Sequence, residues 1–122
     1  MSLQTLDEFI ADRNRPWSAW VLHPDFSSLY VRKTKIFINH ELTPNFITIA
    51  HVIAKRKGKG AFRRLVAYLM EERGFHVQVE CIQNKRLEQH LLNEGWLYQY
   101  KREPYTPCMY KLACNMALQP AH

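Results

Sequence analysis

Apolar residues recur along this chain with two periods, one near two residues and one near 3.6, which predicts strands interleaved with helices. The strand patterns cover residues 17–24, 29–39, 46–54, 75–82, 96–101 and 108–114. The helical patterns cover residues 5–13, 60–73 and 85–93. The early strands follow one another directly and predict an antiparallel meander, whereas the later strand–helix–strand unit predicts a right-handed parallel crossover.

Short polar signals mark the predicted helix ends. Thr5 and Glu8 have the spacing of a capping box, and Asn84 is a good N-cap for the last helix. Gly74 and Gly95 follow the second and third helical patterns, so we expect these helices to stop there.

A turn is predicted over residues 40–45, where Pro44 and Asn45 interrupt the strand pattern. The strand before this turn alternates, and its alternation places one set of residues on the same side: Tyr30, Arg32, Thr34, Ile36 and Ile38.

The chain has 122 residues, which is room for one domain with one hydrophobic core. We expect this domain to span residues 1–114, with residues 115–122 as a loose C-terminal tail. A hydrophobic content of 47% argues against disorder. No apolar run has the length of a membrane span and the N-terminus lacks a signal-peptide pattern, so we expect a soluble cytoplasmic protein with no membrane partner.

The cysteines Cys81, Cys108 and Cys114 are odd in number and lack a Cys-x-x-Cys spacing. The six histidines show no metal-ligand spacing with one another or with the cysteines. We therefore expect neither a disulfide framework nor a metal site.

The formal net charge of +6 predicts an acidic partner, which is nucleic acid, an acidic protein surface or a polyphosphate ligand. Lys55, Arg56, Lys57 and Lys59 gather at a Gly-Lys-Gly turn that leads into the second helix. Glycines let backbone amides approach a phosphate closely. The turn lacks the spacing of nucleoside-triphosphate and dinucleotide loops, and taken alone it fits a solvated basic helix cap better than a ligand site.

Two segments together resemble motifs of the GNAT superfamily of N-acetyltransferases. The first, Ala50 to Phe62, resembles the family's Val-rich strand followed by Gln/Arg-x-x-Gly-x-Gly/Ala. The second, Asn84 to Trp96, resembles an Asn that opens a helix closed by Gly and an aromatic residue. The resemblance covers about residues 29–112, and the short chain is similar to small acetyltransferase-like proteins of bacteriophages.

The first motif aligns in two registers, which begin at Lys55 and at Lys57. The first register puts Arg63 and Arg64 at positions that the family buries, which is costly for unpaired cations, so we prefer the second. The preferred register places Phe62 where the family has Gly or Ala. A bulky residue at this position works against close approach of the backbone to a diphosphate.

The resemblance implies a mixed α/β, GNAT-like fold. It predicts a central mixed sheet of about six strands, antiparallel in its first half, with a parallel pair in the middle and helices on both faces. It also implies acetyl-CoA as the acyl donor, with its diphosphate on the turn and its pantetheine along the central strand. The implied cofactor-binding residues are Val52, Ile53, Ala54, Lys57, Gly58, Lys59, Gly60, Ala61, Phe62 and Asn84.

Direct acetyl transfer needs a neutral amine, so the resemblance also implies a general base. Glu80 is the first candidate, and the alternative for it is an ion pair with a neighbouring Arg or Lys. His51 is the second candidate, although a lone strand histidine is more often a packed core residue. A backbone N–H near Val52 or Ile53 would stabilise the oxyanion.

The acid that protonates the leaving thiolate is often a Tyr in the family's second helix, but this chain has Leu91 at that position. Tyr98 or Tyr100 could replace it, as could water, although strand aromatics more often serve packing. Asn84 could contact the cofactor or simply cap its helix.

Three functions remain open at this level. The first is an acetyl-CoA-dependent N-acetyltransferase acting on an amine of a protein or small molecule. The second is a catalytically inactive GNAT-fold protein that binds CoA or a protein partner. The third, a basic nucleic-acid-binding module, fits less well because the cations gather at one turn without an aromatic strand signature. The sequence does not identify the acceptor amine. A monomer and a homodimer are both compatible with it.

Overall fold

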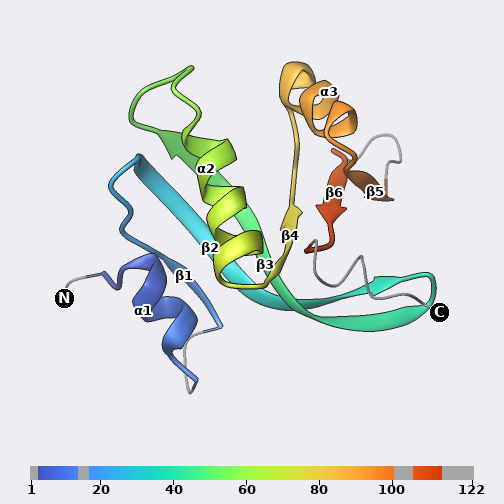
Figure 1. The fold of residues 1–122 in the computed structure, drawn as a ribbon, viewed down its shortest axis with the longest axis horizontal. Helices are drawn as coiled ribbons and strands as arrows, with labels where there is room; N and C mark the ends of the chain where they lie inside the picture. Colours follow the sequence, from blue (N-terminus) through green and yellow to red (C-terminus); the bar gives the residue numbers. More distant parts are fainter. Residues whose placement is uncertain (1–2, 14–16, 101–105, 114–122) are drawn as a thin grey trace.

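The computed structural model describes residues 3–13, 17–100 and 106–113, which form one six-stranded sheet with short helices (Figure 1). In chain order the elements are α1 (Leu6–Ala11), β1 (Ser18–Trp20), β2 (Phe26–Ile38), β3 (Glu41–Ala54), α2 (Ala61–Ala67), the π-helix η1 (Tyr68–Glu72), β4 (His76–Val79), α3 (Lys85–Asn93), β5 (Leu97–Tyr100) and β6 (Cys108–Lys111). Cys114 and the expected tail over 115–122 lie outside the described residues.

The strand order in the sheet is β1-β2-β3-β4-β6-β5. The β3–β4 pair is parallel, with a register from Phe46 opposite His76 to Ile49 opposite Val79. The other pairs of described strands are antiparallel. The mixed α/β class, the antiparallel first half and the parallel central pair are therefore confirmed.

The described helices all pack on one face of the sheet, which we call the helix face. Helices α1, α2 and α3 contribute to the same core cluster as strand side chains of that face, including Leu6, Phe9, Leu65, Leu91, Val31, Ile49, Val79 and Met109. The crossovers β3-α2-β4 and β4-α3-β5 advance across the sheet in the same direction. Because such crossovers are right-handed, α2 and α3 lie on the same face of the sheet. The expectation of helices on both faces is wrong for the described residues.

The opposite face of the sheet, which we call the open face, carries no described helix. A small apolar cluster of Ile36, Phe46 and Tyr110 lies at one end of it. Next to that cluster a hydrogen-bonded chain crosses the strands, in which Thr34 and Thr48 share a bond of 2.6 Å and Thr48 donates to Gln78 at 2.7 Å. Gln78 in turn donates to Gln99. Every buried polar side chain among the described residues has such a partner.

The β2–β3 hairpin runs along most of the molecule (Figure 1). Its turn is formed by Asn39 and His40, both at positive φ. The turn predicted over residues 40–45 is therefore correct only at His40 and wrong for 41–45, which belong to β3. Pro44 and Asn45 instead lie within β3, where the register shifts and an extra residue is accommodated as a bulge. A bulge is one of the few places where a strand tolerates proline.

The predicted helix ends are confirmed. Thr5 and Glu8 form the capping box of α1, the Asn84 side chain caps α3, and Gly74 has a φ of +74° where η1 ends. None of the helices in residues 3–13, 17–100 and 106–113 combines the length and the hydrophobicity of a membrane span.

Candidate functional site

The two parallel strands at the centre of the sheet separate after a short paired stretch. The last bond between them runs from the Glu80 N–H to the Ile49 carbonyl, at 3.1 Å. Strand β3 continues to Ala54 along β2, whereas the chain after β4 turns the other way, and the Ile82 N–H donates to Pro107 at 3.1 Å. Figure 1 shows this divergence between the end of β3 and the segment that connects β4 to α3. We call the place where residues 50–54 and 80–83 diverge the wedge.

A β-bulge at Ala50 lies where the wedge opens. Val31 is opposite Ile49 and Tyr30 is opposite His51, so Ala50 is the extra residue in β3. A bulge bends its strand and increases the local twist, which explains why β3 leaves β4 at this point.

The peptide groups of Val52 and Ala54 face the wedge. The Ile53 carbonyl accepts from the Ser27 hydroxyl and the Lys55 N–H donates to Asp25, so residues 53 and 55 direct their peptide groups toward the β2 side. Peptide groups of successive strand residues alternate between the two edges. Among the described residues, no strand pairs with the β3 edge over 50–54.

The basic turn lies at the end of β3. Gly58 and Gly60 have φ of +76° and +77°, a backbone region that glycine adopts without strain. A pocket of about 420 Å³ beside the turn is lined by Pro24, Asp25, Lys55, Arg56, Lys59, Ala61 and Arg64. We call it the turn pocket; it concentrates positive charge next to the first residues of α2.

No family model, curated protein or solved structure matches this chain significantly. Evidence for its function therefore comes from its own residues and geometry.

Phe62 lies away from the turn pocket. Its ring is half-buried against the core and lines a cavity of about 320 Å³ between α2 and α3, together with Leu91 and Trp96. Ala61, by contrast, is buried and lines the turn pocket. The bulky side chain at position 62 therefore does not line the turn pocket, whereas the Arg64 guanidinium lies over the turn and donates to the Lys59 carbonyl at 2.6 Å.

Glu80 lies on the open face at the apex of the wedge, where it is held by Arg32. The Arg32 guanidinium donates two hydrogen bonds to this carboxylate, one of them at 3.2 Å. The ion pair that the sequence left as an alternative for Glu80 is therefore present. The sequence did not identify Arg32 as the partner of Glu80. The one indication was the strand alternation, which placed Arg32 on the same side as Tyr30 and Thr34.

His51 is also on the open face, where it is exposed and not packed into the core. Its ring lies 5.4 Å from that of Trp20, which lies 4.9 Å from that of Tyr30. Trp20 is 49% exposed, so these three rings form an accessible aromatic corner next to the wedge.

The structure does not bring Tyr98 together with Glu80 and His51. The Tyr98 ring packs against the core on the helix face, and its hydroxyl donates to Glu88 of α3. Two strand spacings of about 5 Å each separate β5 from β4. Leu91 is buried in the core, so the position expected for a tyrosine acid offers no proton donor.

Asn84 uses its side-chain oxygen to cap α3, accepting from the N–H groups of Arg86 at 2.9 Å and Leu87 at 3.3 Å. Cys81, which follows Glu80 at the edge of the wedge, has a φ of +54°, and no sequence signal indicated this. No cluster of three or more metal-ligating side chains occurs within residues 3–13, 17–100 and 106–113.

Proposed function

We propose that the protein is an acetyl-CoA-dependent N-acetyltransferase with a GNAT-like fold, which transfers an acetyl group directly to an amine of a protein or small molecule. The observation that carries the proposal is the wedge: two parallel central strands separate, and the free edge of β3 ends at a glycine-containing basic turn. An extended thioester arm needs such an edge, and the diphosphate attached to it needs such a turn.

The chain's own residues fit the donor in this arrangement. Val52 and Ala54 would pair with the amide groups of the pantetheine arm, as a further strand would. The turn amides from Gly58 to Phe62 and the nearby Lys57 and Lys59 would hold the diphosphate. Ile53 directs its peptide group toward β2, so its contribution would come from its side chain, which is 47% exposed.

The acceptor amine would approach from the open face, because α1, α2 and α3 cover the other face. There the Glu80 carboxylate would accept a proton from the amine, directly or through water, and His51 is a second acceptor nearby. The Val52 N–H points into the wedge and would stabilise negative charge that develops on the thioester oxygen. Water would return a proton to the departing thiolate, because Tyr98 and Leu91 do not offer one.

A catalytically inactive GNAT-fold protein is the second candidate. The observation that favours it is the bidentate pairing of Glu80 with Arg32, together with Leu91 at the expected acid position. Under this proposal the wedge would still bind CoA, but no amine would be acetylated.

Calorimetric titration with acetyl-CoA and CoA, followed by a thiol-release assay over a panel of amines, tests these proposals. The transferase proposal predicts binding of both nucleotides, a higher melting temperature with acetyl-CoA, and amine-dependent thiol release. Binding without thiol release would favour the inactive protein. Absence of binding, with strongly salt-dependent binding of an oligonucleotide instead, would contradict both and support the nucleic-acid module.

A further inference from the structure

The aromatic corner on the open face offers accessible apolar surface next to the wedge. Trp20 on β1 is opposite Tyr30 on β2, which is opposite His51 on β3. The Trp20 ring reaches across β2, because its centroid lies 4.9 Å from that of Tyr30 and 5.4 Å from that of His51. Ile53 is two residues beyond His51 on the same face, and its side chain is 47% exposed. These side chains can therefore pack against a flat apolar ligand.

The aromatic corner begins one strand away from the carboxylate that we propose as the base. Strand β3, which carries His51, is the neighbour of β4, and Glu80 follows the end of β4. Neighbouring strands are about 5 Å apart, so an amine at the Glu80 carboxylate would place its carbon skeleton over the rings.

Glu80 is the one carboxylate among the described residues that lies beside the aromatic corner. The others lie on α1, η1 and α3 or next to these helices, at the turn pocket (Asp25) or at the start of β3 (Glu41). A polyamine gains affinity when each of its ammonium groups pairs with a carboxylate. The open face therefore suits an acceptor with a single amine.

The described residues also place no free lysine or arginine beside Glu80 that could bind a carboxylate of the acceptor. Arg32 is already engaged by Glu80. Lys33, the next residue of β2, packs its ammonium over a ring of the helix-face core. Lys55 comes four residues after the ring of β3, about 13 Å along a strand, and Lys85 lies in α3. An amino acid would thus bring its own carboxylate next to Glu80 without a cationic partner, which is unfavourable.

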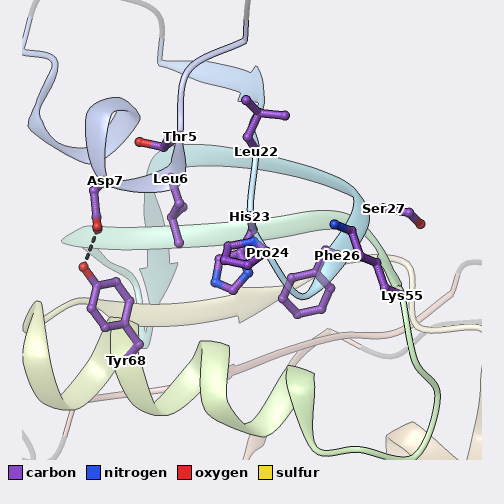
Figure 2. Close-up of a pocket in the computed structure, with 10 residues that line it drawn as sticks. All are labelled: Thr5, Leu6, Asp7, Leu22, His23, Pro24, Phe26, Ser27, Lys55 and Tyr68. Carbon is purple, nitrogen blue, oxygen red and sulfur yellow. Dashed lines mark hydrogen bonds between the residues drawn. The ribbon is translucent and has the colours of Figure 1, made fainter.

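A larger groove, of about 740 Å³, lies on the helix face between α1, the segment 22–27 and η1. Figure 2 shows Asp7 bonded to Tyr68 at one end of this groove and Lys55 at the other. Asp7 also pairs with Arg73 at 3.0 Å, so its charge is already compensated. The sheet separates this groove from the face on which Glu80 lies, so an amine bound in the groove would not reach the proposed base.

We propose that the acceptor is an arylalkylamine, a small molecule with one primary amine on a short chain and an aromatic ring that packs on Trp20 and His51. This inference rests on the proposed function and deepens it, because it gives the acceptor a chemical class. In the transfer, the amine nitrogen bonds to the acetyl carbon and the carbon–sulfur bond of the thioester breaks. Glu80 takes a proton from the nitrogen, and water protonates the departing thiolate.

The test measures thiol release from acetyl-CoA with amines that differ by one group. Ethylamine lacks the ring of 2-phenylethylamine, phenylalanine adds a carboxylate to it, and spermidine carries several amines without a ring. We expect kcat/KM for 2-phenylethylamine to be about tenfold above that for ethylamine, as for one aromatic contact. Phenylalanine should fall at least about tenfold below 2-phenylethylamine, because its carboxylate faces that of Glu80. Spermidine should be no better than ethylamine.

Two tryptophan variants link this preference to the aromatic corner. Trp20→Ala should reduce the advantage of 2-phenylethylamine over ethylamine from about tenfold to about twofold, mainly through KM. Trp17→Ala is the matched control, since Trp17 is 66% exposed and lines a separate pocket with Ile10 and Phe75. It should keep the full advantage.

A second measurement detects binding without turnover. Addition of 2-phenylethylamine should shift the indole N–H NMR signal of Trp20 and the ring signals of His51, and it should leave the indole signal of Trp17 unchanged. Equal kcat/KM for 2-phenylethylamine and ethylamine, an advantage that survives Trp20→Ala, or unshifted ring signals would overturn the inference and leave the proposed function intact. Failure to bind acetyl-CoA would overturn the proposed function, and the ring shifts alone would then decide whether the aromatic corner binds arylalkylamines.

Discussion

Arg32 on β2 reaches across β3 to hold the carboxylate of Glu80, the residue after β4, with two hydrogen bonds. The pair is partly exposed and lies at the apex of the wedge, on the face that no described helix covers. The guanidinium fixes the position of the carboxylate, although the two residues are 48 positions apart in the chain.

Replacing Glu80 tests its proposed role as the base. Glu80→Gln should lower kcat by about 10²–10⁴-fold, the range that a general base contributes, with little change in the KM for acetyl-CoA. The free energy of unfolding should fall by about 1 kcal/mol or less, because a partly exposed ion pair contributes little.

Glu41→Gln is the matched control, since Glu41 is exposed at the start of β3, far along the hairpin from the wedge. It should leave kcat and stability unchanged. Retention of kcat within about threefold in Glu80→Gln would remove the carboxylate from the mechanism and leave His51 as the base to be tested.

Gly58 and Gly74 form a second matched pair. Both have a positive φ and open space around the site of an added Cβ, so alanine at either position costs about 1 kcal/mol of stability for backbone reasons alone. Gly58→Ala should also weaken acetyl-CoA binding by about fivefold to tenfold, because it moves the turn amides. Gly74→Ala, at the far end of the helix, should not. Equal affinities in the two variants would show that the turn does not bind the donor.

His76 should make the protein less stable in mild acid. Burial lowers the pKa of His76 below its usual 6.5, and its Nδ1 accepts from the Ala113 N–H at 2.9 Å. Between pH 6.5 and this lowered pKa the unfolded chain binds more protons than the folded one, so the free energy of unfolding falls as the pH falls.

Denaturant melts of wild type and His76→Asn between pH 5 and 8 measure this effect. Asparagine keeps an acceptor for Ala113, so the variant should show a smaller dependence on pH. The remaining slope belongs partly to His23, whose pKa is also lowered by burial. An unchanged slope in His76→Asn would exclude His76 as its origin.

Local features of the fold were predictable where one residue type determines the backbone. Asn84 and Gly95 bound α3 because a side-chain cap and a glycine at positive φ specify the two ends of a helix. The hairpin turn was misplaced because Pro44 and Asn45 are strong breakers, whereas Asn39 and His40 adopt positive φ without a glycine.

Features that depend on strand order were not predictable. The position of α2 and α3 on one face follows from two crossovers that advance across the sheet in the same direction, which no local pattern encodes. The same holds for the Arg32–Glu80 pair and for the distance of Tyr98 from the wedge, because each depends on strands that are remote in the sequence.

Amide hydrogen exchange of β3 tests the central claim, which is that the edge of this strand is free to receive a ligand. In the free protein the amides of Val52 and Ala54 should exchange quickly, while the amides of Ile53 and Lys55 are protected by their position toward β2. With saturating acetyl-CoA, Val52 and Ala54 should become protected at least about tenfold. Protection of Val52 and Ala54 in the free protein, or exchange that acetyl-CoA leaves unchanged, would contradict the account.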